Sequence, residues 1–197
     1  MPPTFTSTTL TAASLNQLIG ASGNLDWLKG ALTRIGISSD SAAQTVDSAM
    51  SGCRVFNSAA ISIPNATWTL LTFNSEQWDT HDAAASTFHS TSSDTGRITI
   101  PAGRDGYYLI GAHVEFAADV AGRRGLQIVH SVGASVIALS SEDATPSGVH
   151  ALTVCTLWHL AAAEYVTCEV FQNSGAALNA TRSADYSPEF WITFVGI

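Results

Sequence analysis

The stretch GYYLIGAHVEF, residues 106–116, decides the fold class of this chain. With a period of two, its large side chains fall on one face, which holds Tyr108, Ile110, Ala112, Val114 and Phe116. Gly111, His113 and Glu115 fall on the opposite face. Alternation of this kind predicts a half-buried β-strand, with one face against a core and the other toward water.

Eight further segments beyond residue 52 have the same character. They are short, rich in β-branched and aromatic residues, and separated by clusters of Gly, Asn, Asp, Ser and Pro. They are CRVFNSA (53–59), TWTLLTF (67–73), GRITIP (96–101), RGLQIVHSV (124–132), SVIALS (135–140), HALTVCTLWHL (150–160), EYVTCEVFQ (164–172) and EFWITFVGI (189–197). Nine or ten strands with almost no helical pattern predict an antiparallel sandwich or barrel, and the jelly roll is the commonest such design.

The segment from residue 150 to residue 172 is predicted to form a hairpin that turns through AAAE, residues 161–164. A four-residue loop would pair residue 160 with residue 165, which puts Cys155 and Cys168 diagonally on one face. Together with Cys53 they make an odd number without CxxC spacing, which favours neither a disulfide framework nor a zinc site. We expect Cys155 and Cys168 to be buried thiols in a protein made in a reducing cytoplasm.

Residues 1–50 follow a different pattern. The first twelve are rich in Thr, Ser and Pro, which predicts an extended arm. From residue 13 onward, leucines recur at spacings of three and four, which predicts an amphipathic helical region. Gly20, Gly23 and Gly30 would each cost a helix about 1 kcal/mol, so we expect two short pieces rather than one rod. We therefore divide the chain into an arm with short helices, 1–50, and a β domain, 51–197.

Charge and hydropathy exclude several classes of partner. Only 12% of the residues are charged, about half of the ~25% of an average globular chain, and the net charge is −8. Nucleic-acid binding needs a basic stripe, and Lys29 is the sole lysine. No apolar run approaches the ~18 residues of a membrane span, and the first residues lack the pattern of a secretory signal. We therefore expect no nucleic-acid partner and no membrane insertion.

The final segment, EFWITFVGI, is apolar on both faces. Phe190, Ile192 and Phe194 point one way, and Trp191, Val195 and Ile197 point the other. An outer strand of a soluble protein normally has one wet face, so the second apolar face of this strand needs a cover. That cover is provided either by neighbouring copies of the chain or by loops and helices of the same chain.

Three segments, taken in order, resemble the hallmark strands of the complement-globular-head and TNF-like jelly roll: GYYLIGAHVEF (106–116), LWHLAAAEYVTCEVFQNSG (157–175) and FWITFVGI (190–197). The resemblance covers about residues 53–197. It departs at Ala163, because the family often has Gly before the acidic residue of that turn, here Glu164. It implies a mostly β, TNF-like antiparallel jelly-roll sandwich of about ten strands, assembled as a homotrimer with its inner sheet around a three-fold axis. The interface residues it implies are Phe190, Trp191, Ile192, Phe194, Val195 and Ile197.

The segment TLTAASLNQLIGASGNLDWLKG, residues 9–30, resembles the opening of tailed-phage virion proteins that carry such a jelly roll behind a short N-terminal anchor. The match rests on LTAASLN and NLDWL. It implies a virion location, with the major capsid protein or tail proteins as partners, and makes Leu10, Leu15, Leu18, Leu25, Trp27, Leu28 and Leu32 the anchor candidates. We expect a head decoration (cement) protein or a short head fibre. Two alternatives stay open: a tail-tip or tail-fibre protein that binds a host surface glycan, and a non-viral carbohydrate-binding TNF-like module.

Candidate ligand-binding residues gather in WDTHDAAASTFHSTSSDTG, residues 78–96, the longest loop-like segment. They are Trp78, Asp79, His81, Asp82 and His89. A plain solvated loop is the simplest interpretation; contact with a ligand, a sugar or a neighbouring virion protein comes next, ahead of metal coordination. Catalytic patterns are lacking. His113 and Glu115 form an H-x-E triplet without the downstream P-C-x-x-C of the deaminases, and Ser22 lacks the final Gly of a G-x-S-x-G elbow. We predict a non-enzyme that uses no cofactor and no metal.

Overall fold

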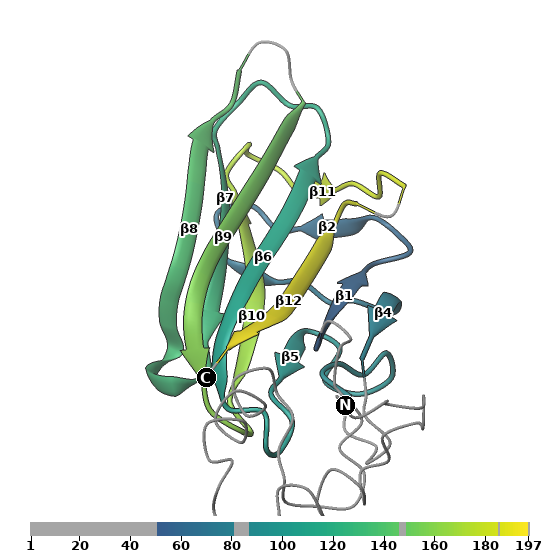
Figure 1. The fold of residues 1–197 in the computed structure, drawn as a ribbon. Helices are drawn as coiled ribbons and strands as arrows, with labels where there is room; N and C mark the ends of the chain where they lie inside the picture. The colour runs from purple at the N-terminus through teal and green to yellow at the C-terminus, as the bar shows by residue number, and fades with distance from the viewer. Residues whose placement is uncertain (1–50, 81–86, 146–148, 185, 197) are drawn as a thin grey trace, which may run out of the picture. The chain divides into compact units, whose positions relative to one another are not determined.

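The computed structural model describes residues 51–80, 87–145, 149–184 and 186–196 (Figure 1). This part of the chain contains twelve strands and one 3-10 turn. In chain order these are β1 (Gly52–Phe56), β2 (Ile61–Ile63), β3 (Thr69–Leu70), β4 (Ser75–Asp79), β5 (Arg97–Thr99), β6 (Gly106–Phe116), β7 (Arg123–His130), η1 (Val132–Ala134), β8 (Ser135–Asp143), β9 (His150–Leu160), β10 (Tyr165–Gln172), β11 (Leu178–Ala180) and β12 (Glu189–Gly196).

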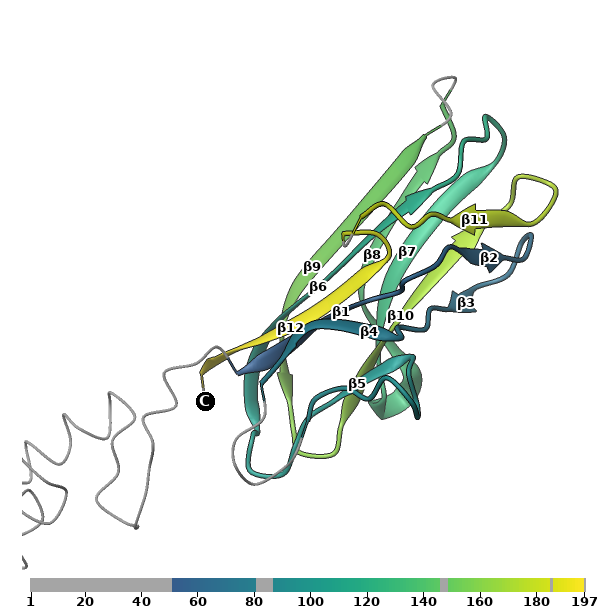
Figure 2. The ribbon, with the colours of Figure 1, turned by 90° about the vertical axis from the view of Figure 1, so that its right-hand side faces the viewer.

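The strands form two antiparallel sheets that pack as a sandwich. In the seven-stranded sheet, β9, β6, β12, β1 and β4 lie side by side in that order, and the short β2–β11 pair joins at the end of β6. In the five-stranded sheet, β8, β7 and β10 lie side by side, and the outer edge of β10 pairs with both β3 and β5. Figure 2 shows the two layers, with β6 and β12 in one and β7 and β10 in the other. The predicted antiparallel sandwich is confirmed.

The core lies between the two sheets and follows the predicted alternation. All five apolar residues predicted for the inner face of β6 are completely buried. They meet Leu126 and Ile128 of β7 and the inward residues of β10 in a single hydrophobic cluster. Burying a side chain of this size stabilises the fold by about 1.5–3 kcal/mol. Burial also raises the pKa of Tyr108 to about 12, and its hydroxyl donates to the Arg104 carbonyl at 2.6 Å.

All nine predicted segments contain a strand, and three short strands were not predicted. β2 and β11 have three residues each, too few for a pattern of period two to be recognised. β4 has the polar sequence SEQWD and lies at the edge of its sheet. Trp78 and Asp79 are therefore strand residues rather than loop residues, which corrects the prediction for this segment.

The predicted hairpin between residues 150 and 172 is wrong. β9 pairs with β6 and β10 pairs with β7, so the chain crosses from one sheet to the other between Leu160 and Tyr165. Cys155 is consequently exposed on the outer face of the seven-stranded sheet, whereas Cys168 is buried between the sheets, and both are free thiols. Cys168 confirms the expected buried thiol and Cys155 contradicts it. Alternation within each strand does not reveal which sheet the strand joins.

The turn at this crossing carries the one departure from the family pattern. Ala163 has φ +67°, a left-handed conformation that favours glycine. Its amide donates to the Ile100 carbonyl at 2.9 Å, which fixes the turn against the strand that precedes β6. Ala163 thus adopts the backbone conformation of a glycine turn, although its side chain is a methyl group.

Some predictions fall outside the described residues. These are the arm of residues 1–50 with its seven anchor candidates, and also His81, Asp82 and Ile197. Within the described residues, no helix is both long enough and apolar enough to cross a membrane.

Candidate functional site

The outer face of the seven-stranded sheet carries a group of exposed apolar side chains. Because the even-numbered residues at the start of β6 point into the core, Tyr107 and Leu109 point outward, together with Leu157 of β9. Val195 of β12, at a bulge in the pairing with β6 near Tyr107, is also exposed. These four side chains, called the apolar face below, are between 39% and 59% exposed. Leu109 and Leu157 lie directly opposite each other across the two strands. Exposed apolar patches are typical of surfaces that bind another molecule.

A tryptophan extends the apolar face toward the middle of the sheet. Trp191 of β12 lies opposite Gly111 of β6, and a Cβ atom on Gly111 would come 2.1 Å from the indole ring. Gly111 therefore leaves the space in which the indole lies against the sheet. On the other side of Gly111, the register places the exposed Cys155.

The other half of the same sheet face carries polar side chains that form hydrogen bonds with one another. The Glu115 carboxylate accepts hydrogen bonds from the hydroxyls of Thr181 (3.3 Å), Ser183 (3.0 Å) and Tyr186 (3.3 Å). His113 is hydrogen-bonded to Thr153 at 2.7 Å rather than to Glu115. His113 and Glu115 thus lie on the same face of β6 but form hydrogen bonds with different residues.

Burial in the single chain reduces the set of predicted interface residues that another chain could contact. Phe190 and Ile192 are completely buried in their own core and are not available to another chain. Phe194 is half-buried, with its ring 5.4 Å from that of Tyr108. Trp191 and Val195 remain on the outer face. The sequence reasoning missed Tyr107, Leu109 and Leu157, although the odd-numbered positions 107 and 109 continue the outward face of β6 and are both apolar.

Three of the predicted ligand-binding residues, Trp78, Asp79 and His89, lie within the described residues. Asp79 and His89 form hydrogen bonds that fix the loop. The buried His89 ring is 2.9 Å from the Glu76 carboxylate through Nδ1 and 3.2 Å from the Thr95 carbonyl through Nε2. Asp79 accepts the backbone amides of Phe88 and His89 at 3.1 and 2.9 Å, while burial raises the pKa of its carboxyl group. Trp78 is half-buried opposite Arg54.

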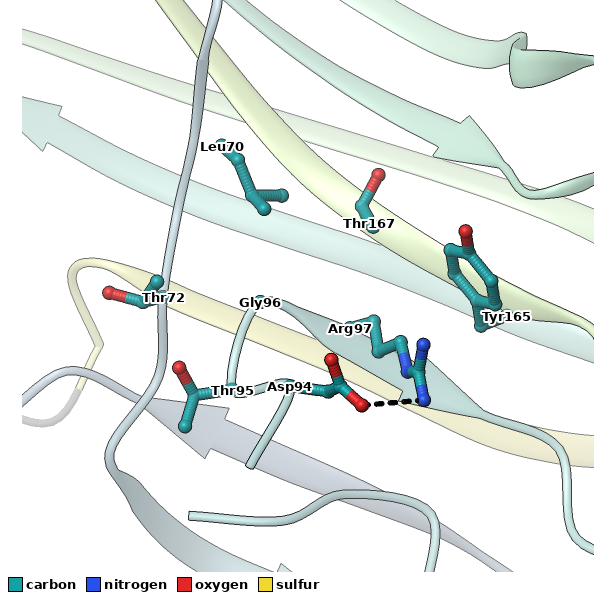
Figure 3. A pocket seen from close by; sticks show the side chains of 8 residues that line it. All are labelled: Leu70, Thr72, Asp94, Thr95, Gly96, Arg97, Tyr165 and Thr167. Atoms are coloured by element: carbon teal, nitrogen blue, oxygen red, sulfur yellow. Dashed lines mark ion pairs between the residues drawn. The ribbon is translucent and has the colours of Figure 1, made fainter. Parts of the chain in front are cut away.

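The loop held in this way forms one wall of a groove on the five-stranded sheet (Figure 3). The groove has a volume of about 420 Å³ and is lined by Leu70, Thr72, Asp94, Thr95, Gly96, Arg97, Tyr165 and Thr167. It forms where the edge partner of β10 changes: β3 pairs with residues 169–170 and β5 with residues 165–167. Between these strands the Leu71 amide donates to the Cys168 carbonyl of β10 at 2.9 Å, and the Phe73 amide then donates to the Thr95 carbonyl of the loop at 2.9 Å.

One ion pair dominates the electrostatics of the groove. Arg97 and Asp94 form an ion pair of 2.8 Å, and the guanidinium carbon lies 5.0 Å from the centre of the Tyr165 ring. Figure 3 shows this pair on the side of the groove opposite Leu70 and Thr167. A smaller hollow of about 120 Å³, lined by hydroxyl groups, adjoins the groove and shares Asp94 and Arg97. In the described residues, no three His, Cys, Asp or Glu side chains gather to hold a metal ion.

The two antiparallel sheets, with this strand order and an exposed apolar face on one of them, define a TNF-like jelly roll. Known structures with this fold include murine APRIL, with a TM-score of 0.55 at 10% identity over 75% of this chain and 100% of that one. Eiger TNF from S. frugiperda has a TM-score of 0.54 at 8% identity, over 75% of this chain and 93% of that one. At this level of identity the similarity establishes the fold. No protein-family model and no curated protein sequence matches the chain.

Proposed function

We propose that this protein is a homotrimeric structural component of a tailed-phage virion, a head decoration protein or short head fibre attached through residues 1–50. The apolar face is the observation that carries the proposal. It lies on the sheet that contains β12, the strand for which the jelly-roll resemblance implies contact with neighbouring subunits. Self-association would remove these side chains from water.

The apolar face would contribute several kcal/mol per subunit to assembly. Complete burial of one such side chain is worth about 1.5–3 kcal/mol, and the four are roughly half exposed, so covering them would contribute about 3–6 kcal/mol per subunit. Three subunits contribute three times this amount, about 9–18 kcal/mol, toward the two association steps of a trimer, each of which costs of order 4–15 kcal/mol. Covering the exposed part of the half-buried Trp191 would add to the favourable free energy of assembly.

The virion location is supported by the N-terminal resemblance in LTAASLN and NLDWL. It is also compatible with the fold, because jelly rolls are a common architecture of viral capsid domains. In this proposal the anchor candidates of the arm bind the particle, and the β domain is displayed outward.

Two measurements test the proposal. Light scattering should give three times 20.6 kDa for the full chain, and immunogold labelling of purified particles should locate the protein on the head. Absence of the protein from purified virions would refute a virion role. Labelling at the tail tip would refute decoration and support receptor binding. Deletion of residues 1–50 should leave a soluble trimer that no longer attaches.

A further inference from the structure

The groove on the five-stranded sheet combines the groups that bind sugars. We propose that it is a carbohydrate-binding site for a neutral oligosaccharide, with Asp94 and Arg97 as its central polar contacts. All of its lining residues belong to one subunit, so this inference does not depend on the trimer or on the virion assignment. No residue of the groove was among the predicted ligand candidates.

The groove offers hydrogen-bonding groups that match a polyol. Thr72, Thr95 and Thr167 each provide a hydroxyl that both donates and accepts. The Asp94 and Arg97 side chains are 62% and 39% exposed although they are paired, so both keep hydrogen-bonding capacity toward the groove. Adjacent hydroxyls of a sugar ring can donate to the carboxylate and accept from the guanidinium at the same time.

Apolar surface accompanies these polar groups. Leu70 is exposed at the rim, and the Tyr165 ring forms part of the lining. A sugar ring has apolar C–H faces as well as hydroxyls, and specific ligand sites pair apolar walls with a few placed polar groups. The volume of about 420 Å³ lies in the ~300–1,000 Å³ range of small-molecule sites, and the adjoining hollow lengthens the site for more than one sugar unit.

Charge selects a neutral ligand. The carboxylate of Asp94 and the guanidinium of Arg97 cancel inside the groove. The nearest acidic group along β10, Glu169, is the pairing partner of Leu70 and accepts a hydrogen bond of 2.7 Å from Gln127. The whole chain carries −8, which repels polyanions such as acidic glycans. A neutral saccharide meets none of this repulsion.

The groove wall is held in place before any ligand arrives. The Thr95 carbonyl accepts the Phe73 amide at 2.9 Å and lies 3.2 Å from the His89 ring. Gly96 allows the loop to meet β3, because a Cβ atom there would come 2.8 Å from the Leu70 side chain. A preformed site loses less conformational entropy on binding. His89 is thus a positioning residue for the wall that carries Asp94.

The test is a glycan array that displays neutral oligosaccharides of glucose, galactose, mannose and N-acetylglucosamine beside sialylated and uronic-acid probes, followed by calorimetry with the strongest neutral probe. We expect the full chain to bind at least one neutral probe, and Arg97→Gln to weaken that binding at least tenfold. Arg123→Gln is the matched control, because Arg123 forms an exposed pair with Asp143 on the same sheet outside the groove. It should bind like the wild type.

A second variant protects the test against misfolding. Asp94 has φ +51°, a conformation that asparagine also tolerates, so Asp94→Asn keeps the loop while it removes the charge. It should weaken binding with an unchanged melting temperature. Failure to bind any neutral probe, a preference for acidic probes, or equal binding by the groove variants and wild type would each overturn the proposal. Light scattering on the same samples separates loss of binding from loss of assembly.

Discussion

Leu157→Asp places a carboxylate in the middle of the apolar face and should convert the proposed trimer into a folded monomer. Leu157 is 55% exposed in the single chain and lies opposite Leu109. Because most of its surface is already wet, the substitution should leave the fold of the subunit almost unchanged. In the trimer, the same position would be covered by a neighbouring copy.

The magnitude follows from what the trimer would bury. Covering the exposed half of Leu157 contributes about 0.8–1.6 kcal/mol per copy, and Asp loses this contribution. A carboxylate with an ordinary pKa of ~3.9 is ionised at pH 7, and its desolvation without a partner costs several kcal/mol more. A loss of only about 2 kcal/mol per copy amounts to about 6 kcal/mol for three copies. This loss lowers the association constant of the trimer by roughly 10⁴-fold.

The assay is light scattering over a dilution series, with thermal unfolding of the same samples. Leu139→Asp is the matched control, because Leu139 is 58% exposed on β8, the edge strand of the other sheet. The control should keep the wild-type mass, and Leu157→Asp should have the mass of a single chain with a similar melting temperature. A wild type that is monomeric at micromolar concentration, or a Leu157→Asp variant that stays trimeric, would refute the reasoning.

Three further substitutions test local features of the fold. Ala163→Gly should stabilise the chain by about 0.5–1 kcal/mol in urea unfolding, because it relieves a left-handed alanine, and a loss of stability would contradict the assigned turn. Gly111→Ala should destabilise by about 1–3 kcal/mol and change tryptophan fluorescence, since the methyl group displaces Trp191, and adding Trp191→Ala should remove most of the penalty. The Ala161 amide and His130 lower the pKa of Glu164 below its ordinary 4.5, so its stabilising contribution is complete above pH 4.5 and is lost as the pH falls through the lowered value. Glu164→Gln should flatten the acid side of the stability profile measured by urea midpoints, and an unchanged slope would remove Glu164 as its cause.

Much of the fold could be predicted from the sequence because strands of a two-layer sandwich have one buried face. Residues 106–116 show this alternation completely, and every predicted inward residue there is buried. Sheet membership could not be predicted in the same way. β9 and β10 have good alternation and a short connection, which looks like a hairpin, yet they belong to different sheets. The energy that decides between the two arrangements comes from long-range pairing with β6 and β7.

The functional surfaces were predictable to different degrees. Trp191 and Val195 were found because a terminal strand that is apolar on both faces is conspicuous. Tyr107 and Leu109 were not predicted, because the other outward residues of this strand, Gly111, His113 and Glu115, are small or polar and are typical of a wet face. The groove had no local signature, since Leu70, Arg97 and Thr167 come from three separate strands and meet only through the edge of β10.

The two outer surfaces of the sandwich carry the apolar face and the groove separately, and this arrangement connects the two proposals. Sheets in a sandwich are separated by about 10 Å of packed side chains, so a residue that points outward from one sheet cannot reach the other surface. The apolar face belongs to β6, β9 and β12, whereas the groove belongs to β3, β5 and β10. A trimer built on the first surface would therefore leave the groove of every subunit open to solvent. Each particle-bound trimer would then present three identical sugar sites, and weak single-site affinity would be increased by multivalency without any change in the groove.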